Sequence, residues 1–179
     1  MTQRLDYEAV AAEGVRALGG VHHYVAKSGL PLALIDMTYL RVSQINGCPY
    51  CIDMHTRDAM KHGVAVEKLM LVSAWRDTGA LFSPQERAAL QWAEALTLIA
   101  QTGAPDADYQ AAAAQFGEKD LVDLTIAIGL MNAYNRIAIG FRRGPDITSP
   151  GDRQRSGFGL AFPLIAARAA PPEGDGYRV

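Results

Sequence analysis

The chain's only two cysteines, Cys48 and Cys51, are separated by two residues, and His55 follows four positions after the second. Side chains of these types at this spacing can form a structural disulfide, bind a metal ion, or act as a reactive dithiol assisted by an imidazole. A closed tetrahedral zinc site would need a fourth ligand, and His62 lies two helical turns beyond His55, where it reaches poorly. A metal site and an unreactive thiol pair stay open as alternatives to a reactive dithiol, which the surrounding sequence favours.

The residues around the thiols predict that both lie at the N-terminus of a helix. Asn46-Gly47 should end one helix, since glycine readily adopts the left-handed conformation that closes a helix, and Pro49 suits the first position of the next. Cys48 is then the N-cap, and both sulfur atoms lie in the positive field of the helix N-terminus, which lowers a thiol pKa. His55 lies one turn after Cys51 on the same face, where it can serve as base for that thiol.

An imidazole that acts as a base needs a third group to orient it, and Asp36 is the predicted partner. The short Asn46-Gly47 turn predicts that the helices on either side of it pair in antiparallel fashion. Counting back from the turn to Asp36 and forward to His55 passes similar numbers of residues, so the two side chains should lie at similar heights. The predicted catalytic residues are therefore Cys51, Cys48, His55 and Asp36.

Helical signals cover nearly the whole chain up to about residue 145, and no segment shows a convincing strand pattern. Caps, prolines and glycines predict helices at 7–27 (with a break or kink at Gly19-Gly20), 31–45, 49–62, 66–77, 84–101, 106–117 and 119–141. We therefore predict an all-α fold, a single-domain helical bundle over residues 1–145 with the CxxC at the N-terminus of a central helix. Residues 146–179 are interrupted by Pro, Gly and Arg and are predicted to form an irregular C-terminal arm, able to pack on a neighbouring subunit.

The composition and charge of the chain limit its partners. With 179 residues, 49% of them hydrophobic and 20% charged, it has the profile of an ordinary soluble globular protein. A formal net charge of −2 gives no electrostatic reason to expect nucleic acid or an anionic membrane as a partner. The N-terminus lacks the apolar segment of a signal peptide and no apolar run could span a bilayer, so we expect a cytoplasmic protein. Stable disulfides are rare in the cytoplasm, which disfavours a structural disulfide.

The helix predicted at 119–141 is apolar on nearly every side, as is typical of a buried helix. One chain of this size cannot easily cover it, so we expect a homo-oligomer in which this helix contributes to the interface. Asn132 and Asn135 interrupt the apolar pattern, and buried polar groups need partners, so both should form hydrogen bonds within the bundle or across subunits. His22 is predicted to face solvent or cap a helix, and His62 to have a structural role.

Residues 40–59, LRVSQINGCPYCIDMHTRDA, resemble the core of the alkylhydroperoxidase D-like proteins of the carboxymuconolactone decarboxylase superfamily. Other matching segments are Trp75-Arg76, Phe82–Leu90, Trp92–Glu94 and Asn132–Arg136, so the resemblance spans roughly residues 20 to 145. It implies an all-helical scaffold that assembles as trimers or hexamers and reduces peroxides with its thiols. It also implies a peroxide substrate and an external dithiol reductant as partners, with no metal, flavin or haem required.

The resemblance assigns roles to the predicted residues: Cys51 is the peroxidatic thiol, Cys48 the resolving thiol, and His55 part of a proton relay. The acidic member of that relay lies twelve residues before the first cysteine and is usually Glu; in this chain the position is Asp36. Aspartate is one methylene shorter, so its contact with His55 can require a bridging water. The helix field favours Cys48 as the more acidic thiol, yet we expect Cys51 to attack, because His55 activates it locally and a low-pKa Cys48 leaves readily during disulfide reduction.

The sequence thus predicts a thiol peroxidase that reduces hydrogen peroxide or organic hydroperoxides through a CxxC dithiol/disulfide cycle. One alternative is a decarboxylase or γ-lactone-processing enzyme of the same superfamily, although such members usually lack the CxxC. Another is a redox sensor or binding protein whose disulfide changes its assembly without meaningful turnover. Steady peroxide consumption with a dithiol reductant is expected of the peroxidase, and a single stoichiometric oxidation of the sensor.

Overall fold

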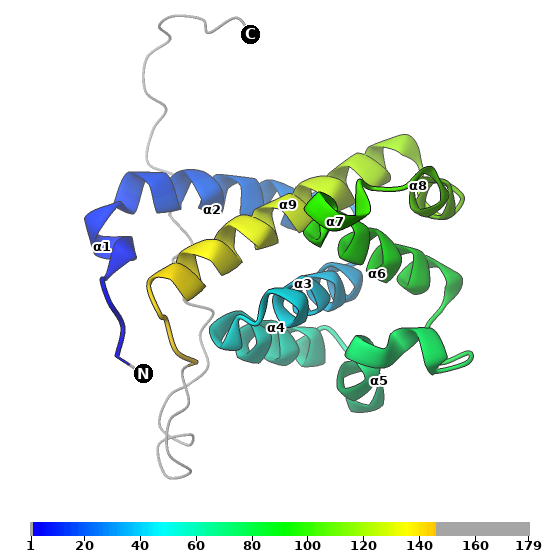
Figure 1. Ribbon diagram of the computed structural model, residues 1–179, viewed down its shortest axis with the longest axis horizontal. Coiled ribbons are helices and arrows are strands. Elements are labelled where there is room, and N and C mark those ends of the chain that lie inside the picture. Colours follow the sequence, from blue (N-terminus) through cyan, green and yellow to red (C-terminus); the bar gives the residue numbers. More distant parts are fainter. Residues whose placement is uncertain (1, 146–179) are drawn as a thin grey trace, which may run out of the picture. The chain divides into compact units, whose positions relative to one another are not determined.

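The computed structural model describes residues 2–145, and the arm predicted at 146–179 lies outside these described residues. The described chain is built from helices and contains no strand, which confirms the all-α prediction (Figure 1). The elements are α1 (Tyr7–Val10), α2 (Ala12–Ala26), α3 (Leu32–Asn46), α4 (Pro49–Lys61), α5 (Val66–Leu71), the 3-10 helix η1 (Val72–Asp77), α6 (Pro84–Thr97), α7 (Ile99–Thr102), α8 (Asp106–Ala113) and α9 (Glu118–Gly140).

Helix α3 forms the centre of the bundle and packs against α4, α6 and α9 (Figure 1). Its residues 34–40 are buried without interruption, as expected of a helix that is covered on several sides. Tyr39 and Leu40 of this helix join Leu124 and Met131 of α9 in the hydrophobic core. The helix that carries Asp36 is therefore held in place by packing on most of its surface.

The hairpin of α3 and α4 places the two cysteines as predicted. Gly47 has φ = 71° and ψ = 38°, the left-handed conformation that ends α3 and that glycine adopts without steric cost. Cys48 is the N-cap of α4, and Pro49 is its first residue. Helix α4 closes with His62 as its C-cap, so the thiols and this imidazole lie at opposite ends of one helix.

The break in the first predicted helix lies at a different place from the one expected. It occurs at Ala11, where φ is −123° and ψ is 46°, after a single turn that the Asp6 side chain caps. Gly19-Gly20 stay helical within α2. Packing of α2 against α9 offsets the helical cost of these glycines, which is about 1 kcal/mol each relative to alanine.

Other predicted helices are shorter or divided. The helix predicted at 66–77 becomes a 3-10 helix at Val72, with a kink at Ala74, and the one predicted at 84–101 is divided at Leu98. The helix predicted at 106–117 ends at Ala113. No glycine or proline marks these three interruptions, so the local sequence does not reveal them.

Helix α9 is buried along most of its length, as its apolar sequence predicts. Within one chain, however, Val122 and Ile139 of this helix stay 57% and 41% exposed. The expectation of a homo-oligomer that covers such residues stays a prediction. In the part of the chain that the structure describes, no helix combines the length and the hydrophobicity needed to cross a membrane.

Candidate active site

Cys48 and Cys51 are free thiols buried in the core, with 0% and 2% of their surface exposed. The backbone N–H of Cys51 donates a hydrogen bond of 3.4 Å to Sγ of Cys48, so a sulfur atom caps the helix. Backbone N–H groups at a helix N-terminus stabilise negative charge. The Cys48 sulfur is therefore in the better position to exist as a thiolate.

The two thiols differ in acidity, and Cys48 is the one that ionises first. The pKa of the Cys48 thiol is lowered from 9.0 to about 7, first because the Cys51 thiol donates a hydrogen bond to it, and further by backbone N–H groups and by Asn135. The pKa of the Cys51 thiol is raised well above its usual range, because its proton is held by Cys48 and because burial disfavours the charged form. This order of acidity agrees with the helix-field prediction.

Asn135 of α9 connects the thiols to the rest of the bundle. This side chain is fully buried, and its Nδ2 atom donates hydrogen bonds to Oγ of Ser43 at 3.1 Å and to Sδ of Met131 at 3.4 Å. Its Oδ1 atom accepts a hydrogen bond of 2.9 Å from Nδ2 of Asn46. Hydrogen bonding from Asn135 also lowers the pKa of both thiols. Its place in an apolar helix predicts a buried partner, but only the fold shows that Asn135 lies close enough to the cysteines to lower their pKa values.

Asp36 lies between two imidazoles. Its Oδ1 atom is 3.7 Å from Nδ1 of His55, which is longer than a hydrogen bond, and its Oδ2 atom is 2.5 Å from Nδ1 of His62. The hairpin thus brings Asp36 near His55 as predicted, with the gap expected of the shorter aspartate. His62, predicted to have only a structural role, is the closer partner of the carboxylate. Among the described residues, no group of three His, Cys, Asp or Glu side chains is arranged to hold a metal ion.

His55 is 2% exposed, and neither of its ring nitrogens has a hydrogen-bond partner among residues 2–145. Its ring packs against Tyr39, with the centroids 4.9 Å apart. His22 of α2 approaches the same tyrosine, with centroids 6.2 Å apart, and burial, followed by the nearby His55, lowers the pKa of His22. His22, for which a solvent-facing or capping role was predicted, is half-buried and belongs to the surroundings of the site. Both nitrogens of His55 stay available to a water molecule or a substrate oxygen.

Arg143, which follows α9, brings a positive charge close to the N-terminus of α4. Its guanidinium lies over the Tyr50 ring, 4.2 Å from the centroid, donates a hydrogen bond of 3.3 Å to the Tyr7 hydroxyl and pairs with Glu8. The charge of Arg143 lowers the pKa of Cys51, a smaller effect than those that raise it. Arg143 was not among the predicted site residues, because nothing in the local sequence links it to the cysteines.

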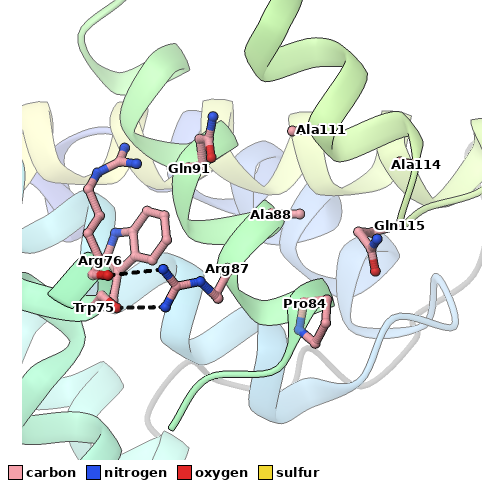
Figure 2. Close-up of a pocket in the computed structure, with 9 residues that line it drawn as sticks. All are labelled: Trp75, Arg76, Pro84, Arg87, Ala88, Gln91, Ala111, Ala114 and Gln115. Atoms are coloured by element: carbon pink, nitrogen blue, oxygen red, sulfur yellow. Dashed lines mark hydrogen bonds between the residues drawn. The ribbon is translucent and has the colours of Figure 1, made fainter. Parts of the chain in front are cut away.

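A separate hollow of about 520 Å³ lies between η1, α6 and the end of α8, and the predicted catalytic residues do not line it. Figure 2 shows Arg87 at this hollow, donating hydrogen bonds of 3.0 Å to the backbone carbonyls of Trp75 and Arg76. The guanidinium groups of Arg76 and Arg87 also stack on the Trp75 ring. These contacts support the packing of η1 on α6.

Comparisons with known proteins agree with this fold. The model of the carboxymuconolactone decarboxylase family matches residues 11–95, which include both thiols and Asp36, His55 and His62. Uncharacterized protein YdfG of Bacillus subtilis (strain 168) is 37% identical over 139 residues, 78% of this chain and 94% of YdfG. Uncharacterized protein YnjA of Escherichia coli (strain K12) is 32% identical over 125 residues, 70% of this chain and 65% of YnjA.

Solved structures with a similar fold support the same family. A protein of unknown function from Agrobacterium tumefaciens, described as a candidate antioxidant defence protein AhpD, is 38% identical, with a TM-score of 0.79 over 82% of this chain and 100% of that one. The debrominase Bmp8 in its apo form is 19% identical, with a TM-score of 0.68 over 82% of this chain and 76% of its own, a likeness that shows the fold alone. The chain therefore belongs to the carboxymuconolactone decarboxylase family and is an alkylhydroperoxidase D-like member of it.

Proposed function

We propose that the protein is a thiol-dependent peroxidase that reduces hydrogen peroxide or organic hydroperoxides at Cys51 and Cys48. The observation that carries the proposal is a pair of buried cysteines at a helix N-terminus, where Sγ of Cys48 accepts a hydrogen bond from the backbone N–H of Cys51, with a buried imidazole one turn away. A thiolate is the nucleophile in peroxide reduction, and two thiols in contact can close to a disulfide. The relative from Agrobacterium tumefaciens that is described as a candidate antioxidant defence protein gives independent support.

In the first step, Cys51 attacks the O–O bond of the peroxide. His55 accepts the Cys51 proton, the sulfur takes the distal oxygen, and the proton passes to the departing alkoxide. The products are a Cys51 sulfenic acid and an alcohol, or water when the substrate is hydrogen peroxide. No proton is exchanged with solvent in this step.

In the second step, the Cys48 thiolate attacks the Cys51 sulfenic acid. A disulfide forms, and the hydroxide that leaves takes up one proton to become water. An external dithiol then reduces the disulfide by thiol–disulfide exchange, becomes a disulfide itself, and returns one proton to the solvent when the Cys48 thiolate is restored. The sum is one peroxide and one dithiol converted to an alcohol, a water and a disulfide.

The test is peroxide consumption by the reduced protein with dithiothreitol, using hydrogen peroxide and cumene hydroperoxide. Turnover far beyond one equivalent is expected, and Cys51→Ser and Cys48→Ser variants should lose it. Mass analysis of the oxidised protein should show the loss of two hydrogens within the peptide that contains both cysteines. If peroxide consumption stops at one equivalent, the protein is a redox sensor and not a peroxidase. If disulfides form only between chains, the mechanism with Cys48 as resolving thiol is wrong.

A further inference from the structure

Three side chains of the α3–α4 hairpin lead from the buried site towards the surface. The exposed fraction of the side chain rises from 3% at His55 to 10% at Asp36 and 36% at His62. Asp36 makes both contacts, with Oδ1 3.7 Å from His55 and Oδ2 2.5 Å from His62. A buried imidazole and a partly exposed one are thus joined through a single carboxylate.

The contact of His62 with Asp36 determines how a proton can pass between these three side chains. When Nδ1 of His62 carries a proton, it donates to the Asp36 carboxylate in a charge-assisted hydrogen bond, and Nε2 is then the nitrogen that can exchange protons with water. The 3.7 Å gap between Asp36 and His55 is within reach of one bridging water or a small side-chain shift.

The proposed catalytic cycle requires such a path. One proton enters the site when Cys48 closes the disulfide, and one leaves when the Cys48 thiolate is restored, although both thiols are buried. The other ionisable side chains near His55, Asp36 and His62 are less suited to carry this proton. Asp58 pairs with Lys61 at 2.8 Å on α4, and burial lowers the pKa of His22 on α2, which disfavours its charged form.

We propose that His62 is the outer member of a His62–Asp36–His55 relay that carries this proton between solvent and the buried thiols. The inference rests on the proposed function and extends it to a residue outside the CxxCxxxH core. His62 acts through Asp36, so its loss should slow proton transfer between solvent and the buried thiols.

The experiment follows proton uptake while reduced protein is oxidised by one equivalent of hydrogen peroxide, in weakly buffered solution with a pH-indicator dye in a stopped-flow instrument. His62→Ala should take up the proton at least about tenfold more slowly than wild type, within the range of acid–base contributions. Added imidazole should restore the rate, because it can replace a side chain that is partly exposed. His23→Ala, which removes an exposed histidine of α2, is the matched control and should behave as wild type.

His62→Asn separates proton transfer from positioning. Its amide can still donate a hydrogen bond to Asp36 but cannot pass a proton on, so it should be as slow as His62→Ala. Wild-type proton uptake in either variant would overturn the relay. A slow His62→Ala variant that imidazole does not rescue would also overturn it, because His62 would then only hold Asp36 in place.

A parallel series with diamide as the oxidant keeps this inference distinct from the proposed function. Diamide takes two electrons and the Cys51 proton from the two thiols, and Cys48 carries no proton in the thiolate form, so disulfide formation again draws one proton from solvent. If diamide oxidises the wild-type protein and peroxides do not, the protein is not a peroxidase. In that event the same comparison of wild type with His62→Ala and His62→Asn still decides the relay.

Discussion

The backbone N–H of Cys51 and the Sγ atom of Cys48 are joined by a hydrogen bond of 3.4 Å. Ser, Thr, Asp or Asn usually accepts this bond at the start of a helix, and a thiolate can replace their oxygen because it is also an acceptor. The Asn46-Gly47 turn makes Cys48 the N-cap, so Cys48 is the sulfur that the helix N-terminus stabilises as a thiolate.

The Cys48 thiol should titrate near pH 7. Its pKa is lowered to about 7, mainly by the hydrogen bond from the Cys51 thiol, so the thiolate forms as the pH rises through that value. Ultraviolet absorbance of the thiolate, measured from pH 5 to 9, checks this. Cys51→Ala removes the donor and should move the midpoint towards 9.0, whereas Cys51→Ser keeps a hydroxyl donor and should change it less. An unchanged midpoint in Cys51→Ala would contradict the role of the Cys51 thiol in lowering the pKa of Cys48.

The stability of the reduced protein should depend on pH through the same group. The pKa of Cys48 is lower in the folded chain than in the unfolded one, so its contribution is fully present above about pH 9 and is lost as the pH falls through 7. The raised pKa of Cys51 acts in the opposite sense, and only above pH 9. Urea unfolding at pH 6 and pH 8.5 should therefore show a gain with pH that the Cys48→Ser variant lacks.

Asn135→Ala should both destabilise the protein and raise the pKa of Cys48. The variant leaves Ser43 without its donor and Asn46 with Asn132 as its remaining partner, which should cost about 1–3 kcal/mol, and it removes a side chain that favours the thiolate. Asn132→Ala is the control, because Asn132 also bonds to Asn46 but does not contribute to the thiol pKa shifts. Urea unfolding and thiol titration of both variants separate the two effects; equal titration midpoints would mean that Asn135 only supports the bundle.

The parts of the site that depend on helix caps and on the spacing of residues along a helix could be predicted from the sequence. The glycine that ends α3 and the proline that begins α4 place Cys48 at the N-cap, and the rise per residue of two paired helices brings Asp36 near His55. The resemblance to a known family then gave these residues a chemistry, and the family is confirmed.

The parts that could not be predicted depend on packing between distant segments. Asn135 and Arg143 influence the thiols only because α9 packs against α3 and α4, and His22 approaches His55 only because α2 lies beside α9. His62 was recognised as a residue near the end of α4. Its contact with Asp36 could not be read from the sequence, since it depends on the rotation of α4 about its own axis relative to α3.

The protein should form a homo-oligomer in which α9 contributes to the interface. Val122 and Ile139 are exposed within one chain although the helix around them is buried, and covering them would remove apolar surface from water. Light scattering should give a mass several times 19.3 kDa. Val122→Asp should weaken the assembly, whereas Met70→Asp, at an exposed apolar position of α5, should not. A monomeric wild-type protein would contradict the prediction.

The last prediction concerns Asp36, the carboxylate shared by the two histidines. Asp36→Asn keeps the size of the side chain and removes the negative charge that stabilises an imidazolium, so it should slow Cys51 oxidation by about ten- to a thousandfold, in the range of acid–base contributions. Asp36→Glu restores the residue that is usual in the family and adds one methylene, which should close the 3.7 Å gap to His55 and keep or raise the rate.

The relation between Asp36 and His55 can be measured by combining their variants. If Asp36 acts through His55, the double variant Asp36→Asn/His55→Ala should oxidise Cys51 hardly more slowly than His55→Ala alone, because the two groups work as one unit. The measurement is the second-order rate of Cys51 oxidation by peroxide, with circular dichroism of each variant to confirm that the helices are intact. If the two losses simply multiply, or if Asp36→Asn reacts at the wild-type rate, Asp36 does not orient His55. Its bond to His62 would then serve only to tie the end of α4 to α3.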